Sequence, residues 1–201
     1  ISALDFTIFV DAIDGTELIQ RINQANLDCP TATTINLTGT DYTFATSISA
    51  LNGANALPVI ECDITIEGNG QTIQRSATTA SHFRIFAIKS PGRLTLNNVT
   101  VQRGHLTTFN GGAIYITDGS GFTMNNSSIR ISESVSGSGG GLLYFANAVS
   151  TGFSINNSTF YNNIARDGGG ITIVHNLIPT IPVTHTIIDS NLTNNAALER
   201  G

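Results

Sequence analysis

The side chains that could do chemistry in this chain are few, and two carboxylates stand out. Only 11% of the 201 residues are charged, against about 25% in an average globular chain. Asp167 and Glu199 fall at equivalent positions of two repeated segments, and Arg166 and Arg200 adjoin them. Two neighbouring carboxylates could hold calcium or a sugar. The alternative interpretation is a pair of solvated charges at a corner of the fold.

The remaining candidates for catalysis or metal binding show no supporting pattern. The histidines at 82, 105, 175 and 185 share no repeated position, and we expect them at the surface. No serine lies in a GxSxG segment, and no cysteine or histidine pair has metal-ligand spacing. We therefore predict no catalytic residue, no metal ligand and no cofactor other than calcium.

The charge and hydropathy of the chain argue against nucleic-acid binding and against a membrane-spanning helix. The formal net charge of −5 argues against binding to nucleic acid. No apolar run approaches the roughly 18 residues that a membrane-spanning helix needs. The chain starts at Ile1 without a leader-like segment, which we interpret as a mature or trimmed product.

The two cysteines indicate the compartment. Cys29 and Cys62 are separated by 33 positions and belong to no CxxC pair. A disulfide in an exported protein is the favoured interpretation, and two buried free thiols in a cytosolic protein are the alternative.

A repeat of about 30 residues organises the chain from residue 63 onward. Three segments align on an asparagine pair: RLTLNNVTVQRG (93–104), GFTMNNSSIRIS (121–132) and GFSINNSTFYNN (152–163). Looser copies are DITIEGNGQTIQ (63–74) and HTIIDSNLTNNA (185–196). Glycine clusters and a second apolar stretch follow the pairs, in GGAIYI, GGGLLYF and GGGITIV.

Within each copy the apolar residues alternate with period two, which is typical of strands. Strands this short bury a core only by stacking on their neighbours. The sequence therefore predicts an all-β, right-handed parallel β-helix. Its inward residues would be Leu94, Leu96, Phe122, Met124, Phe153 and Ile155, and its outward file would be Thr95, Thr123, Ser154 and Thr186.

The asparagine pairs should stack at a tight bend. Residues at equal positions in successive turns lie about 4.8 Å apart, so amides can bond along the stack. The predicted ladder consists of Asn97, Asn98, Asn125, Asn126, Asn156 and Asn157.

Residues 1–62 differ from the repeats and predict an N-terminal cap. Leu18, Ile19, Ile22 and Ala25 have helical spacing, so we expect an amphipathic helix at about 14–26. Asp14 and Glu17 are placed to cap it. Residues 63–201 would form the turns, and the C-terminal turn is expected to be open. Either the coil continues beyond the chain or copies stack end to end through that turn.

Two groups of segments carry a family resemblance. GGAI (111–114) with FTMN (122–125), FSIN (153–156) and FYNN (160–163) resembles the repeats of chlamydial polymorphic outer-membrane proteins. DGTELIQRINQAN and LPVIECDITIEGNGQTI resemble the start of secreted bacterial β-helix proteins of the pectate-lyase-like superfamily. Two of the three glycine motifs depart from the first pattern, since they contain GGGL and GGGI.

The resemblance implies a non-catalytic extracellular or cell-surface protein, used in adhesion or as a self-assembling structural component. Its partners would be a carbohydrate or a host or cell-surface protein. The alternative is a polysaccharide-binding or lyase-like enzyme. The loop 175–184 is a candidate partner-binding segment through Leu177, Ile178, Ile181 and Val183, unless it folds down over its own coil.

Overall fold

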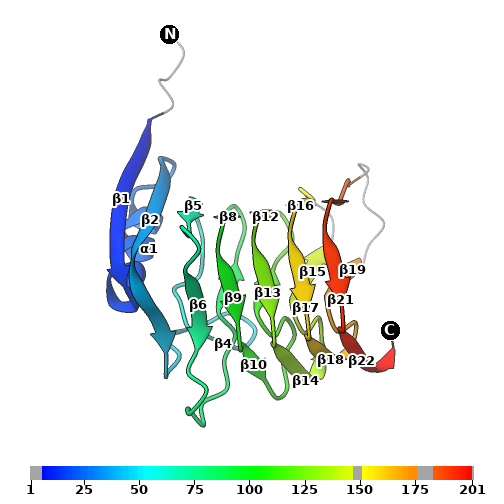
Figure 1. Ribbon diagram of the computed structural model, residues 1–201. Helices are drawn as coiled ribbons and strands as arrows, with labels where there is room; N and C mark the ends of the chain where they lie inside the picture. Colours follow the sequence, from blue (N-terminus) through cyan, green and yellow to red (C-terminus); the bar gives the residue numbers. More distant parts are fainter. Residues whose placement is uncertain (1–5, 147–150, 176–182, 201) are drawn as a thin grey trace.

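The structure is a computed structural model that describes residues 6–146, 151–175 and 183–200, and it shows a parallel β-helix. Figure 1 shows the strands lying side by side in sequence order along one axis, with the N-terminal strands and the helix at one end. The predicted fold class is confirmed.

Two sheets form the longest faces of the coil, and β2 (Ala32–Phe44) bends from one into the other. The first sheet contains β1 (Thr7–Asp14), β2, β5 (Asp63–Glu67), β8 (Arg93–Asn97), β12 (Gly121–Asn125), β16 (Phe153–Asn156) and β20 (Thr186–Ile188). The second sheet contains the end of β2, β6 (Thr72–Arg75), β9 (Thr100–Gln102), β13 (Ser128–Arg130), β17 (Thr159–Tyr161) and β21 (Asn191–Thr193).

Two smaller sheets complete each turn. The third contains β10 (His105–Leu106), β14 (Glu133–Ser138), β18 (Ile164–Asp167) and β22 (Ala196–Arg200). The fourth contains β7 (Phe86–Ile88), β11 (Ile114–Ile116), β15 (Leu142–Ala146) and β19 (Ile171–His175). β3 (Ser49–Ala50) and β4 (Ala54–Asn55) form a short antiparallel hairpin, and a parallel bridge from Asn55 to Arg84 joins this hairpin to the segment before β7.

The core is continuous because equivalent apolar residues stack from turn to turn. In the first sheet Ile64, Leu94, Phe122 and Phe153 pair in register. All six predicted inward residues are buried, none more than 4% exposed. A single turn contributes too few apolar side chains to fold alone, so each turn depends on its neighbours.

Asparagine side chains bond along the stack at the corner between the first and second sheets, as predicted, for Asn97, Asn125 and Asn156. The Nδ2 of Asn156 donates to Oδ1 of Asn125, and Nδ2 of Asn125 donates to Oδ1 of Asn97, both at 2.9 Å. Asn97 in turn donates to the Glu67 carboxylate at 2.6 Å. The donors all point toward the N-terminal end, so the ladder terminates on an acceptor.

The second asparagine of each pair has a different role. Asn98, Asn126 and Asn157 adopt φ angles of 49°, 49° and 45°, where asparagine is tolerated better than most residues. Their side chains are exposed, and only one bond between them is present, from Asn157 Nδ2 to Asn126 Oδ1 at 2.6 Å. The pair therefore combines a bonding side chain with a residue that turns the backbone.

Buried serines extend this corner. Ser127 Oγ accepts from the Val99 N–H at 3.1 Å and donates to the Asn125 carbonyl at 2.7 Å. Ser158 makes the equivalent bonds one turn later. These hydroxyls satisfy backbone groups that the bend removes from the sheets.

A second buried amide ladder lies at the corner between the second and third sheets. Asn163 is fully buried, and its Nδ2 donates to the Ile129 carbonyl at 2.9 Å and to Asn195 Oδ1 at 3.0 Å. Its Oδ1 accepts from the Ser132 N–H at 3.1 Å. The sequence analysis did not single out these two residues, because the turns before Asn163 carry Ser132 and Gly104 at this position instead of asparagine.

Glycine is required where the third sheet leads into the fourth. Gly111 and Gly139 have φ angles of 69° and 70°. A Cβ on Gly112 would collide with the Gly140 carbonyl oxygen of the next turn. The glycine clusters therefore allow backbones of successive turns to approach closely.

The predicted helix is present as α1 (Gly15–Leu27), shifted by one residue from the expected range. The Asp14 carboxylate accepts from the Glu17 N–H at 2.8 Å, and Glu17 accepts from the Ile13 N–H at 3.1 Å. Leu18, Ile22 and Ala25 are buried in the core at the N-terminal end. Cys29 and Cys62 form the predicted disulfide, which joins the segment after α1 to the start of β5.

Parallel stacking begins before residue 63. Ile35 of β2 pairs with Ile66 of β5, and Tyr42 of β2 pairs with Ile73 of β6. Residues 32–44 thus already form two sides of a turn.

We predict that Asn163→Ala lowers the free energy of unfolding by about 3 kcal/mol, because it leaves the buried Ser132 N–H without the Asn163 acceptor and removes the bonds from Nδ2 to the Ile129 carbonyl and to Asn195. The matched variant Asn157→Gly removes an exposed amide but keeps the left-handed backbone, and should cost about 1 kcal/mol or less. Chemical denaturation of both variants measures the difference. Equal losses would contradict the assignment of the second ladder as a stabilising element.

Removal of the disulfide should destabilise the N-terminal end. The bridge closes a loop of 33 positions, which corresponds to about 3–4 kcal/mol in the chain-entropy treatment. We expect a loss of that size for the double variant Cys29→Ser, Cys62→Ser, measured by denaturation without reductant. The parent protein in reductant serves as the comparison, and unchanged stability in both would contradict the prediction.

Candidate functional site

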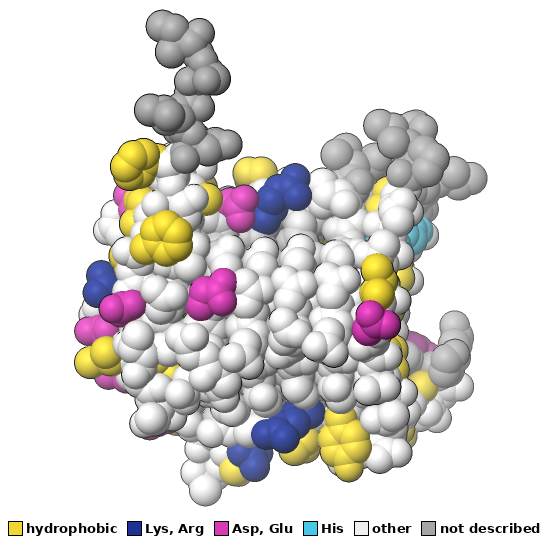
Figure 2. All heavy atoms as spheres, turned by 45° about the horizontal axis from the view of Figure 1, so that its top comes forward, with side chains coloured by type: hydrophobic (Ala, Val, Ile, Leu, Met, Phe, Trp, Pro, Cys, Tyr) yellow, Lys and Arg dark blue, Asp and Glu magenta, His cyan; other side chains and the backbone are white. Residues whose placement is uncertain are grey.

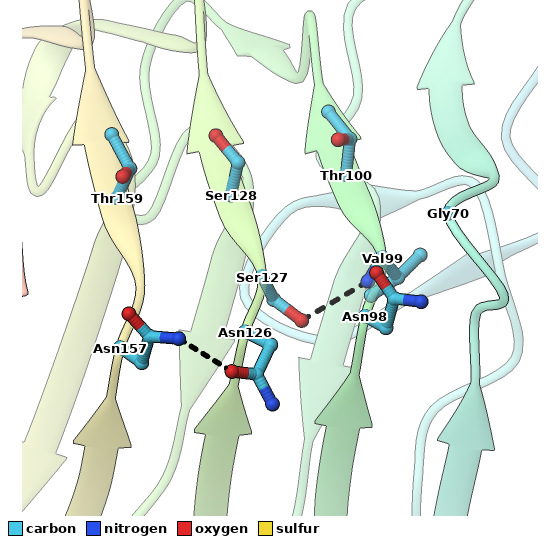
Figure 3. A pocket seen from close by; sticks show the side chains of 9 residues that line it. All are labelled: Gly70, Asn98, Val99, Thr100, Asn126, Ser127, Ser128, Asn157 and Thr159. Carbon is cyan, nitrogen blue, oxygen red and sulfur yellow. Dashed lines mark hydrogen bonds between the residues drawn. The ribbon is translucent and has the colours of Figure 1, made fainter.

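An open groove of about 260 Å³ follows the corner between the first and second sheets. Figure 3 shows that its walls repeat along the stack: each of three successive turns contributes an asparagine and a hydroxyl residue. The asparagines are Asn98, Asn126 and Asn157, and the hydroxyl residues are Thr100, Ser128 and Thr159. We call this surface the asparagine groove.

Much of the hydrogen-bonding capacity of the groove is unused. The hydroxyls of Thr100, Ser128 and Thr159 and the amide of Asn98 make no side-chain hydrogen bond within the described part of the chain. The part-buried Asn97 and Asn125 and the buried Ser127, by contrast, all make side-chain hydrogen bonds. The groove therefore offers regularly spaced neutral donors and acceptors to a ligand.

The neighbouring first-sheet face is also nearly free of charge. Thr95, Thr123, Ser154 and Thr186 pair in register, which confirms the predicted outward file. In Figure 2 the middle of this face is mostly white, and the charged side chains lie mainly toward its borders. A broad polar surface with little charge therefore borders the asparagine groove on this side.

The predicted register of the two carboxylates is wrong by one residue, because a shift in the third sheet pairs Asp167 with Arg200, and Arg166 contacts both carboxylates. Asp167 Oδ2 accepts from Arg166 Nε and Nη2 at 3.0 and 2.9 Å, and Glu199 Oε2 lies 3.7 Å from Arg166 Nε. Arg166 therefore compensates charge that calcium would otherwise attract. No group of three or more potential metal ligands occurs among the residues that the structure describes. A calcium or sugar site at Asp167 and Glu199 remains a prediction.

The predicted partner-binding loop is mostly outside the described residues, which exclude Leu177, Ile178 and Ile181. Val183 is described and is partly buried. Other apolar side chains are exposed on the turn formed by β20 to β22: Ile187, Ile188, Leu192 and Leu198 are between 44% and 65% exposed. End-to-end stacking through this turn remains a prediction.

The structure assembles a polar cluster that the sequence analysis missed. His105 Nδ1 lies 3.2 Å from Glu133 Oε2, and the His105 and His82 rings are 4.7 Å apart. Arg75 and Arg103 line the same pocket. Burial lowers the pKa of His105, although the nearby Glu133 opposes this shift. The available signal was the register that places His105 directly beside Glu133 in the third sheet.

Arg84 is a buried cation with a structural role. It is fully buried, donates to the carbonyls of Leu51 and Asn52 at 2.8 and 2.6 Å, and lies over the Tyr115 ring at 4.8 Å. Burial lowers its pKa to about 9. These bonds hold the loop between β3 and β4 against the coil, so we do not assign Arg84 to a binding site.

His185 occupies an aromatic pocket between β15 and the start of β16. Its ring centroid lies 4.9 Å from that of Tyr144 and 4.5 Å from that of Phe153. Both ring nitrogens are buried without a hydrogen-bond partner among the described residues. Burial, and then the nearby His175, lower the pKa of His185.

Comparisons of the chain with protein-family models, characterised proteins and solved structures found no match. Within the described ranges, no helix is long and apolar enough to cross a membrane. The parallel β-helix is therefore established by the strand pairing itself.

The lowered pKa of His185 predicts a loss of stability in acid. The unfolded chain binds a proton near pH 6.5, whereas the folded chain does so only at lower pH, so the stabilising difference is present above about pH 6.5 and is lost as pH falls through the folded pKa. We expect His185→Phe to flatten the pH dependence of the melting temperature between about pH 7.5 and 5. An unchanged slope in this variant would contradict the assignment to His185.

Proposed function

We propose that this protein is a non-catalytic extracellular β-helix that acts in adhesion and binds a neutral glycan along the asparagine groove. The observation that carries the proposal is the repeated set of unused neutral hydrogen-bonding groups on three successive turns. A glycan presents hydroxyls at regular intervals, which match amides and hydroxyls placed about 4.8 Å apart.

The chemistry of the groove favours this class of ligand over others. No charged side chain lines it, so it does not select an ionic ligand. Its only apolar member, Val99, is buried, so it lacks the exposed aromatic or aliphatic anchor that protein interfaces use. A hydroxyl-rich ligand can form hydrogen bonds with the amides and hydroxyls that make up the rest of the lining.

The disulfide supports an extracellular location, because such bonds persist in oxidising compartments. The resemblance of the repeats to chlamydial polymorphic outer-membrane proteins, and of the N-terminal segment to pectate-lyase-like secreted proteins, agrees with a surface role. Adhesion is the activity that the groove supports best within that resemblance.

A second candidate function is cleavage of a polysaccharide. The observation that favours it is the contact of His105 with Glu133 beside Arg75 and Arg103, since a histidine held by a carboxylate can act as a base. Incubation with uronic-acid polymers and calcium, followed by absorbance of unsaturated products, distinguishes an enzyme from an adhesin. Turnover would overturn the non-catalytic assignment.

We predict that the double variant Thr100→Val, Thr159→Val loses glycan binding by about tenfold or more, because it removes two hydroxyls from the groove at nearly constant shape. The matched control is Thr65→Val, Thr95→Val, which removes two hydroxyls from the adjoining first-sheet face. Binding to an array of neutral and acidic glycans, followed by titration of the best ligand, measures both variants. Absence of any neutral ligand, or equal losses in both variants, would contradict the proposal.

A further inference from the structure

Three arginines at the C-terminal ends of second-sheet strands form no ion pair among the described residues. Arg75, Arg103 and Arg130 come from three successive turns, and none takes part in the ion pairs formed among the described residues. In a chain with a net charge of −5, such an uncompensated cationic cluster is unusual. We call these residues the arginine cluster.

Glutamines rather than carboxylates orient two of these guanidinium groups. Gln74 Oε1 accepts from Arg103 Nη1 at 2.6 Å, and Gln102 Oε1 accepts from Arg130 Nε at 2.8 Å. Gln102 also donates to Gln74 at 2.6 Å. Gln74 and Gln102, which we call the glutamine file, therefore hold the guanidinium groups in place and leave their positive charge available to a ligand.

Arg75 is held with part of its donor capacity unused. Its Nη1 donates to the Ser76 carbonyl at 2.9 Å, and its guanidinium carbon lies 5.9 Å from the centre of the Phe83 ring. Its Nε is buried and has no hydrogen-bond partner among the described residues. A buried donor without a partner is destabilising unless a ligand or water completes it.

A pocket of about 220 Å³ opens between these side chains. Its polar walls are Arg75, Arg103, His105 and Glu133, and Ala77, Gly104 and Ile131 complete it. The charged groups of the pocket are therefore two guanidinium groups and one carboxylate, and the carboxylate contacts His105.

The backbone beneath the pocket is in a disfavoured conformation. Arg103 and Ile131 have φ angles of 61° and 53°, at a corner where the next two turns place Asn162 and Asn194. Asparagine tolerates this region, whereas a β-branched residue is a clear outlier there. Strain of this kind occurs where a particular side chain is needed for function. Here the strained position places a guanidinium group in the pocket.

We propose that the pocket between Arg75, Arg103 and His105 is a binding site for a tetrahedral oxyanion, a sulfate or phosphate group. Guanidinium groups bind such oxygens with charge-assisted hydrogen bonds, and two of them can share one dianion. The Nε2 of His105 is available as a third contact, because Nδ1 faces Glu133. This inference does not depend on glycan binding in the asparagine groove.

A dianion with three or more free oxygens fits this pocket better than a carboxylate. A carboxylate has two oxygens and one charge, so once His105 is protonated and balances Glu133, a bound carboxylate would leave one guanidinium group uncompensated. Sulfate and phosphate supply both the second charge and an oxygen for His105. The resident Glu133 already occupies the carboxylate-binding side of His105.

Anion binding should strengthen in acid. Burial lowers the pKa of His105, with Glu133 opposing the shift and His82 and Arg75 adding to it. Arg103 also lines the pocket. As pH falls, protonated His105 balances Glu133 and becomes a donor at Nε2, so affinity rises below about pH 6.5.

The test uses inorganic sulfate, whose charge does not change over this range, titrated by NMR at about pH 7.5 and about pH 5.5. We expect saturable shifts of arginine Nε resonances, tighter binding at the lower pH, and a loss of about tenfold in Arg103→Gln. The control Arg93→Gln removes the same charge from the edge of the first sheet and should change affinity less than about twofold. Folding of each variant is checked by its melting temperature, and Arg75→Lys provides a second variant that keeps the charge but loses Nε.

Further titrations identify the source of the oxyanion. A sulfated polysaccharide that binds more tightly than inorganic sulfate, and loses that advantage in Arg103→Gln, identifies a polymer-borne group. Equal affinities identify the free anion, and both results support the site. Acetate or a uronic-acid polymer binding better than sulfate would overturn the proposal. Equal sulfate binding by the parent protein, Arg103→Gln and Arg93→Gln would also overturn it and would leave the asparagine groove unaffected.

Discussion

Each residue of this protein lies about one strand spacing from its counterpart in the next turn, and this constraint governs both its composition and its surface. A side chain at a corner or on a face must be compatible with a neighbour of similar type. Asparagine satisfies this requirement because its amide is both donor and acceptor, as the bonds from Asn156 to Asn125 and from Asn125 to Asn97 show. Side chains of like charge at equal positions of successive turns would repel one another. The low charge content of the chain follows directly.

Charged residues occur where they end or interrupt a file. Glu67 accepts the last bond of the asparagine ladder and donates none in return. Arg103 and Arg130 are bonded to the glutamine file, which supplies neutral acceptors. Arg84 leaves the solvent entirely and bonds to backbone carbonyls. Glu67 and Arg130 pair with neutral residues in the adjoining turns, whereas Arg75 and Arg103 follow paired glutamines and form the exception within the arginine cluster.

The same constraint produces two different surfaces on either side of the second sheet. Its strands are only three or four residues long, apart from the bent β2. The asparagine groove borders one edge with repeated neutral groups, and the arginine cluster borders the other with uncompensated charge. Between the hydroxyl residues of the groove and the arginine cluster lie the paired Gln74 and Gln102. A polymer crossing this sheet can therefore contact both neutral and cationic groups within a short distance.

The helix, the core and the asparagine ladder were predictable from the sequence, because each depends on a local period or on a repeat. Period-two alternation placed Leu94, Phe122 and Phe153 inside, and the coincident asparagine pairs gave the register directly. Helical spacing and a capping pair identified α1. These features can be recognised in the sequence because neighbouring turns carry similar residues at equal positions.

Other features depended on the tertiary structure, because their partners are dissimilar residues in different turns. Asn163 pairs with Asn195 but with Ser132 and Gly104 in the turns before it, so no repeat marked it. The repeat was recognised by its like residues, so the unlike pair His105 and Glu133 did not stand out although the register brings them together, and the side chains around Arg75 and Arg103 were decided by packing. Arg166 between Asp167 and Glu199 was likewise decided by side-chain packing. The sequence thus determined the stacking rule, and the folded chain decided which unlike side chains that rule brings into contact.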